Sequence, residues 1–193
     1  MQKKAKREII EWAILITVGG ALYFTGYHTE VIGQLQRGLL ATGLMQPDLD
    51  QDKQQLPNYA LNLKFKNREG KILTLRDFAD KPVFLNFWAT WCPPCIAEMP
   101  DIENLYMDMH QEAHFILISV DQEASKAWEF QDRKAFAFPV YTIEGGIPPT
   151  FAYEAIPTTF VLNRQNEIVL RREGMAKYNS ESFRKFLTDL SRQ

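Results

Sequence analysis

Runs of apolar residues and their spacing divide most of the chain into short strands and helices. Residues 83–88 are apolar except for Asn86, and residues 115–120 form a second apolar run. Such runs are typical of strands that are covered on both faces of a sheet. Between them, residues 93–110 carry apolar side chains at helical intervals. This order predicts two buried strands joined by a helix.

The rest of this region continues the same alternation of strands and helices. Residues 59–65 alternate apolar and polar side chains, which predicts a half-buried strand. Asp121 is a suitable N-cap for a helix that reaches to about residue 135. The other predicted elements are a strand at 71–75, a strand at 138–143, a hairpin of 158–162 and 167–172, and a helix at 180–190. The pattern predicts an α/β fold, with a mixed central sheet flanked by helices.

The first part of the chain has a different pattern. Residues 9–27 contain only one charge, Glu11, and residues 12–24 are apolar on every face. About 17–25 apolar residues are needed to span a bilayer, so the segment has just enough length for a transmembrane helix. Basic residues precede it: Lys3, Lys4, Lys6 and Arg7. We interpret it as a signal anchor with a cytoplasmic basic end and an exported remainder; a cleaved signal peptide and a buried helix are the alternatives.

A second helical pattern and a polar stretch follow the predicted anchor. Apolar residues between 28 and 45 recur at near-helical spacing, which suits a segment on the membrane surface or against the anchor. Its glycines at 33, 38 and 43 argue against one continuous helix. Residues 46–57 are polar and lack periodicity, which indicates a linker. The predicted organisation is an anchor at 1–27, an amphipathic segment and linker at 28–57, and a globular domain at 58–193.

Composition limits the classes of function. The chain has 193 residues and a net charge of −2, and its charged residues are well mixed, which argues against a nucleic-acid partner. A hydrophobic content of 46% and an aromatic content of 12% are sufficient for an ordinary globular core.

The only two cysteines of the chain, Cys92 and Cys95, lie at the predicted junction of a strand and a helix. A thiol at a helix start ionises more easily, because the helix dipole and unpaired N–H groups stabilise a thiolate. Zinc would need four ligands, and none of the three histidines has a useful spacing to the pair. Haem attachment would need histidine where Ile96 stands. A bridge across so short a loop removes little chain entropy, so thiol–disulfide exchange is the preferred interpretation.

The motif and its surroundings resemble a known family. The run from Asn86 to Cys95 (Asn-Phe-Trp-Ala-Thr-Trp-Cys-Pro-Pro-Cys), followed by Glu98 and by Ile156-Pro157-Thr158, is similar to thioredoxin-fold proteins of the TlpA/ResA type. The resemblance covers residues 58–193. It implies a thioredoxin-like domain that is tethered to the cytoplasmic membrane and faces the periplasm or the cell exterior.

The resemblance also implies roles for individual residues. Cys92 is expected to be the exposed attacking thiol and Cys95 the resolving thiol. Pro157 is expected to form a cis peptide bond beside the disulfide, although the sequence alone favours an ordinary trans proline at a strand start. The backbone of Ile156 is expected to pair with an extended peptide of the partner protein. We expect Trp91, beside Cys92, to form an exposed apolar rim on which a partner docks.

Glu98 is the candidate proton acceptor. On a helix it stands about 60° from Cys95, on the inward side, where burial would raise its pKa. It could then take the proton of Cys95 during exchange; the alternative is a solvated surface glutamate. Asn86 stands where thioredoxin itself has a buried aspartate. Because an amide does not titrate, proton transfer would fall to Glu98 or to water.

The predicted function is reduction of disulfides in partner proteins, with the redox-active disulfide as the only cofactor and a membrane electron donor to restore the thiols. Pro93 and Pro94 offer no N–H to the Cys92 sulfur, which favours a reducing couple. Family substrates include apocytochrome cysteines, in cytochrome c maturation, and oxidised metal-site cysteines. A thiol oxidase or isomerase is the nearest alternative. A peroxidase would need proline and threonine at positions held by Leu85 and Ala89, and a non-enzymatic docking module would not need the cysteines.

Overall fold

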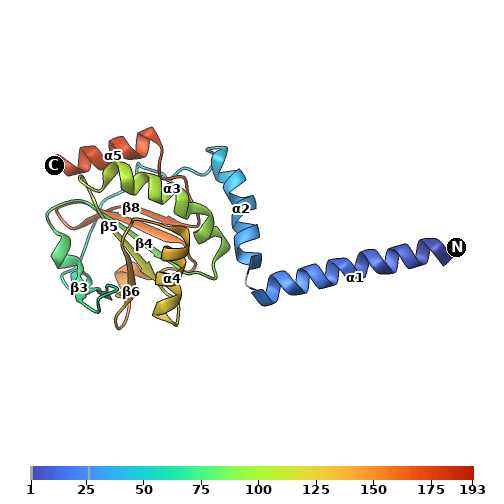
Figure 1. Ribbon diagram of the computed structural model, residues 1–193. Helices are drawn as coiled ribbons and strands as arrows, with labels where there is room; N and C mark the ends of the chain where they lie inside the picture. The colour runs from blue at the N-terminus through green and yellow to red at the C-terminus, as the bar shows by residue number, and fades with distance from the viewer. Residues whose placement is uncertain (1, 26) are drawn as a thin grey trace.

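The computed structural model describes residues 2–25 and 27–193. Met1 and Gly26, which fall within the predicted anchor, lie outside the described residues. An eight-stranded mixed sheet forms the centre of the domain, in the order β1-β8-β7-β4-β5-β6-β2-β3 (Figure 1). Its strands are β1 (Gln54–Gln55), β2 (Lys64–Lys66), β3 (Ile72–Thr74), β4 (Val83–Trp88), β5 (His114–Ser119), β6 (Val140–Ile143), β7 (Thr158–Leu162) and β8 (Glu167–Glu173).

Among the described residues, five helices and three short 3-10 turns accompany the sheet. The helices are α1 (Gln2–Thr25), α2 (Tyr27–Ala41), α3 (Pro93–Met109), α4 (Ala124–Lys134) and α5 (Glu181–Ser191), and the turns are η1 (Ala60–Asn62), η2 (Leu75–Phe78) and η3 (Pro149–Phe151). The mixed sheet and its helices agree with the predicted α/β fold. The predicted strand at 59–65 is wrong in its first half, where the N–H of Ala60 donates to the Pro57 carbonyl and closes a turn.

The two faces of β4 explain how the layers form. All six of its residues are buried, and it pairs with β5 in parallel and with β7 antiparallel. Phe84 and Trp88 point to one core, which the buried residues of α3, α4 and α5 complete. Leu85 and Phe87 point to a second core on the other face, which η1, η2 and η3 cover. Asn86, between Phe84 and Trp88 in the alternation, therefore faces the helices.

The start of α4 differs from the prediction. Its N-cap is Glu123, two residues after Asp121. The Asp121 carboxylate instead accepts hydrogen bonds from the backbone N–H and the hydroxyl of Thr90, at 3.0 and 2.7 Å, and from the hydroxyl of Ser119, at 2.7 Å. The side chain thus joins the end of β5 to the segment that leads into Cys92.

The N-terminal helix α1 projects away from the domain (Figure 1). It has 24 residues, and most of the apolar side chains described in it are exposed. Within the part of the chain that the structure describes, no helix has the length and apolar character to cross a membrane. The signal anchor therefore stays a prediction.

Helix α2, which covers most of the segment predicted to lie on the membrane surface or against the anchor, packs on α3 of the domain. Its place at the membrane stays a prediction. Helix α2 crosses α3 near the active-site motif, where Gly33 lies so close that an added Cβ would stand 3.3 Å from the carbonyl oxygen of Pro93. The helix continues through Gly33 and Gly38, and Gly43 follows its end with a φ of 74°. The absence of a side chain at position 33 is what allows the two helices to approach.

The segment predicted as a linker, residues 46–57, lies along the domain. Just before it, the Met45 carbonyl accepts a hydrogen bond from the N–H of Lys177 (2.7 Å). Gln54 and Gln55 then pair with β8 as the edge strand β1, and Leu56 is buried.

Candidate active site

Cys92 and Cys95 form a disulfide at the first turn of α3. Cys92 is the N-cap of the helix, and its Sγ accepts a hydrogen bond from the N–H of Cys95 at 3.2 Å. Pro93 and Pro94 suit the first helical positions because their missing N–H groups would be unpaired there. They also leave Cys95 as the first residue after Cys92 whose N–H can reach the sulfur. The sulfur thus has a single donor within its own turn.

The exposure of Cys92 differs from the expectation. In this disulfide form the residue is only 3% exposed, and Cys95 is fully buried. The physical reason is the packing of the cis-proline loop, since the Cys92 Sγ lies 3.6 Å from the carbonyl oxygen of Ile156. Trp91 is 59% exposed and forms the open apolar surface beside the motif, as expected.

The Ile156–Pro157 peptide bond is cis, as the resemblance predicted. The loop is fixed on both sides: the Thr158 hydroxyl donates to the Ala155 carbonyl at 2.6 Å, and the Gly174 N–H donates to the Pro157 carbonyl at 2.8 Å. The bond lies where β7 begins, next to the disulfide. The backbone of Ile156 is therefore held against the Cys92 sulfur.

Glu98 is fully buried on the inner face of α3. Its Oε1 accepts a hydrogen bond from Asn86 Nδ2 at 3.0 Å, and its Oε2 accepts one from the Ala176 N–H at 3.2 Å. Burial raises the pKa of the carboxyl from 4.5 to about 8, because the two donors only partly offset the loss of solvation. The solvated surface alternative is excluded, and the raised pKa favours the protonated form of the side chain at neutral pH.

Asn86 holds this acid in place, a contact that the sequence did not predict. Its Nδ2 also donates to the Thr159 hydroxyl at 2.9 Å, so the amide links β4, α3 and β7. Its Oδ1 is buried and has no partner among the described residues. The sequence did contain one indication of this role, because Asn86 is the single polar residue in an otherwise apolar strand.

Trp88 has the core role predicted for it, since it is fully buried and packs on Phe130 with ring centroids 5.5 Å apart. Among the residues that the structure describes, no three His, Cys, Asp or Glu side chains come together in a group that could hold a metal ion.

Comparisons with known proteins agree with this geometry. The Redoxin family matches residues 51–185. The thiol-disulfide oxidoreductase ResA of Bacillus anthracis is 30% identical over 188 residues, which cover 96% of this chain and 99% of that protein. ResA of Halalkalibacterium halodurans is 33% identical over 127 residues, which cover 64% of this chain and 72% of that protein.

Solved structures show the same fold. A putative thiol:disulfide interchange protein DsbE from Chlorobium tepidum has a TM-score of 0.62 at 21% identity, and covers 72% of this chain and 98% of its own. StoA from Bacillus subtilis has a TM-score of 0.54 at 24% identity, and covers 66% of this chain and 98% of its own.

The disulfide at a helix start and these relatives together make the protein a thiol–disulfide oxidoreductase of the thioredoxin fold. Within that class the chain belongs to the Redoxin family, and it is of the ResA/TlpA type.

Proposed function

We propose that the protein reduces disulfides in partner proteins outside the cytoplasm, with Cys92 as the attacking and Cys95 as the resolving thiol. The observation that carries the proposal is the buried Glu98, one turn after Cys95, whose pKa is raised to about 8. An acid with a pKa near that of a thiol can accept and return its proton with little loss of free energy. Glu98 is thereby suited to ionise Cys95 at the step where it must attack.

The reaction begins with the reduced pair. The Cys92 thiolate attacks one sulfur of the partner disulfide, whose S–S bond breaks, and the released partner sulfur takes a proton. When Glu98 is ionised, Cys95 gives its proton to the carboxylate and attacks the Cys92 sulfur. This second attack breaks the mixed disulfide and releases the other partner sulfur as a thiolate, which takes a proton. Two electrons have then passed to the partner, and the Cys92–Cys95 disulfide has formed.

The direction of transfer follows from the proline pair. Pro93 and Pro94 offer no N–H, so the Cys92 sulfur has one donor in its turn, the N–H of Cys95. A thiolate with few donors gives a less stable reduced form, and hence a more reducing couple. This favours a reductase over an oxidase or isomerase of the same fold.

The location is part of the proposal. The basic residues before residue 9 and the apolar run up to residue 24 support a signal anchor in the cytoplasmic membrane, with the domain on the outer side. A dithiol in an oxidising compartment needs a continuous supply of electrons, for which we propose a membrane-embedded donor. Cysteines of apocytochromes, in cytochrome c maturation, and oxidised metal-site cysteines are the proposed substrates.

Trapping tests the function. In a Cys95→Ser variant of the full chain, attack by Cys92 proceeds but resolution cannot, so mixed disulfides with partner proteins should accumulate in cells. The matched Cys92→Ser variant should form almost none. Equal trapping by the two variants would overturn the assignment of the attacking thiol. Rapid consumption of hydrogen peroxide by the wild type would favour the peroxidase.

A further inference from the structure

Helix α2 turns its charged side chains inward. The helix has one acidic residue, Glu30, and one arginine, Arg37, and both contact the domain. Glu30 binds Lys134 at the end of α4 with an N–O distance of 2.6 Å. Arg37 donates to the carbonyl oxygen of Ile96 at 3.4 Å.

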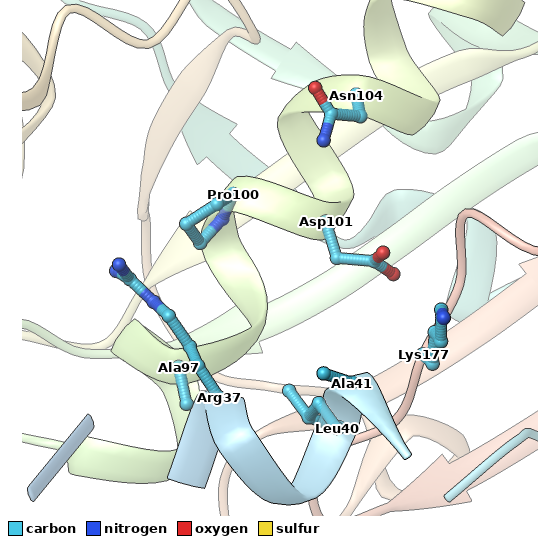
Figure 2. A pocket seen from close by; sticks show the side chains of 8 residues that line it. All are labelled: Arg37, Leu40, Ala41, Ala97, Pro100, Asp101, Asn104 and Lys177. Carbon is cyan, nitrogen blue, oxygen red and sulfur yellow. The ribbon is translucent and has the colours of Figure 1, made fainter. Parts of the chain in front are cut away.

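Two small or apolar residues complete this inward stripe. Gly33 is buried against the first turns of α3, and Leu40 is buried in a small cluster with Ala97 and Met175. Together with Glu30 and Arg37 they recur at intervals of three or four residues, so they form one face of the helix. Beside Arg37 and Leu40 the seam between α2 and α3 opens into a pocket of about 260 Å³, where Arg37 and Lys177 lie on different walls (Figure 2).

The opposite face of α2 is apolar and exposed. We call it the outer stripe; it consists of Val31, Ile32, Leu35 and Leu39, with exposed fractions between 42% and 75%. A helix that faced water on this side would carry its charges here and its apolar residues towards the domain. The polarity of α2 is the reverse, which indicates that the outer stripe has an apolar partner.

The position of α1 identifies that partner. Only one residue separates the end of α1 at Thr25 from the start of α2 at Tyr27. Helix α1 leaves on the side of α2 that faces away from the domain (Figure 1). The described side chains of α1 between residues 9 and 22 are also largely apolar and exposed.

We infer that the outer stripe of α2 binds the surface of the lipid bilayer, at the boundary between head groups and acyl chains. The inference rests on the proposed anchor, because α1 must enter the same bilayer. Helix α2 is about 22 Å long, and a helix attached so closely to a membrane span cannot reach far from its surface. An uncharged apolar stripe is what interfacial helices bury in lipid.

A consequence concerns the disulfide. Gly33 fixes α2 against Pro93, so the first turn of α3 is separated from the bilayer by roughly one helix diameter, about 10 Å. The active-site end of the domain then stays close to the membrane, where a membrane-embedded electron donor could reach it.

Depth measurement on the full chain tests the inference. In a Cys92→Ser, Cys95→Ser background, Leu35→Cys is labelled with an environment-sensitive fluorophore, and the protein is reconstituted into phosphatidylcholine–phosphatidylglycerol vesicles. Ile72→Cys is the matched control, because Ile72 is also apolar and exposed but lies in the edge strand β3, far from α2. Nitroxide lipids should quench the label at position 35, at a depth of about 5–10 Å, and should leave position 72 unquenched.

Each alternative outcome would overturn the inference. If the protein floats with the vesicles but the label at position 35 is as exposed to water and as little quenched as the label at position 72, the chain is anchored but the outer stripe does not bind lipid. If the label at position 35 is in an apolar environment but is not quenched by nitroxide lipids, and position 35 crosslinks to a second chain, another copy of the protein covers the outer stripe. If the protein does not float, the proposed anchor fails and the inference fails with it.

Discussion

Glu98 and Asp101 lie less than one turn apart on α3, and both accept hydrogen bonds from the backbone of residues 176–179. Their surroundings nevertheless differ. Glu98 faces the sheet and is fully buried, whereas Asp101 is partly exposed on the outer side, at the pocket beside α2. Burial raises both pKa values, and that of Glu98 reaches about 8, which lies in the range of a thiol. The inner carboxyl can therefore serve proton transfer, while the outer one fastens the helix to the chain.

The same contrast extends to the two faces of α3. On the inner face, Asn86 and the Ala176 N–H hold Glu98 from two different elements. On the outer face, α2 packs against the helix at Gly33, Arg37 and Leu40, and a pocket remains beside these contacts. The carboxyl proposed for proton transfer thus lies on the face of α3 that packs on the sheet, and the connection to the N-terminal helices lies on the opposite face. The following predictions compare the two faces.

The largest effect is expected on the rate of resolution. Glu98→Gln removes the proton acceptor for Cys95 and should slow release of the partner thiol about 10²–10³-fold. The wild-type rate should rise as the pH approaches and passes about 8, where Glu98 ionises. This rise of the rate with pH should be absent from the variant. Stopped-flow measurement of mixed-disulfide decay between pH 6 and 9.5 would show it. Asp101→Asn is the control from the outer face and should retain the wild-type pH profile.

The free energy of unfolding should also depend on the ionisation of the Glu98 carboxyl. Its pKa is about 8 in the folded protein against an ordinary value of 4.5, which we take for the unfolded chain, so the stability it contributes is fully present below pH 4.5 and is lost as the pH rises to 8. At 1.36 kcal/mol per pH unit, the loss amounts to roughly 5 kcal/mol. Denaturation of the oxidised wild type and of Glu98→Gln should give free energies of unfolding that converge below about pH 4.5 and separate progressively up to about pH 8. If the free energies of unfolding of the two proteins changed in parallel with pH, the Glu98 carboxyl would be solvated in the folded protein and its pKa would not be raised.

Local patterns were sufficient to predict the central elements of the domain. The apolar strand at 83–88 and the helix that starts after Cys92 follow from residues that are neighbours in sequence. Glu98 could be placed on the inward side because helical periodicity relates it to Cys95. The family motif predicted the cis bond before Pro157, which residue preferences alone would not have favoured.

Contacts between distant segments could not be predicted in this way. The N–H that binds Glu98 belongs to a residue 78 positions later, and the contact of Gly33 with Pro93 joins two segments with unrelated patterns. Asp121 looked like a helix cap because the sequence does not show that Thr90 lies beside it. The low exposure of Cys92 likewise depends on the loop at Ile156, which only the folded chain brings near.

A smaller effect is expected from the outer carboxyl. Asp101 Oδ2 accepts the backbone N–H groups of Tyr178 and Asn179 at 2.6 and 2.8 Å, and so fastens α3 to the segment before α5. Asp101→Ala leaves these donors without their acceptor and should lower the free energy of unfolding by about 1–3 kcal/mol at neutral pH. The decay of mixed disulfides should keep its rate and pH profile. A large loss of rate with little loss of stability would mean that the outer carboxyl also takes part in proton transfer.

The smallest effect, of about 1 kcal/mol or less, should come from two glycines of α2. Alanine is a better helix former than glycine by roughly 0.8–1.0 kcal/mol, so Gly38→Ala, where an added Cβ meets nothing within 4 Å, should stabilise α2. Gly33→Ala gains the same propensity, but its Cβ would stand 3.3 Å from the Pro93 oxygen and 3.4 Å from Ile96 Cγ2, so the helices must separate slightly. Hydrogen exchange should therefore slow in α2 for Gly38→Ala and quicken for Gly33→Ala. Slower exchange in both variants would mean that α2 is not held by its contact at Gly33.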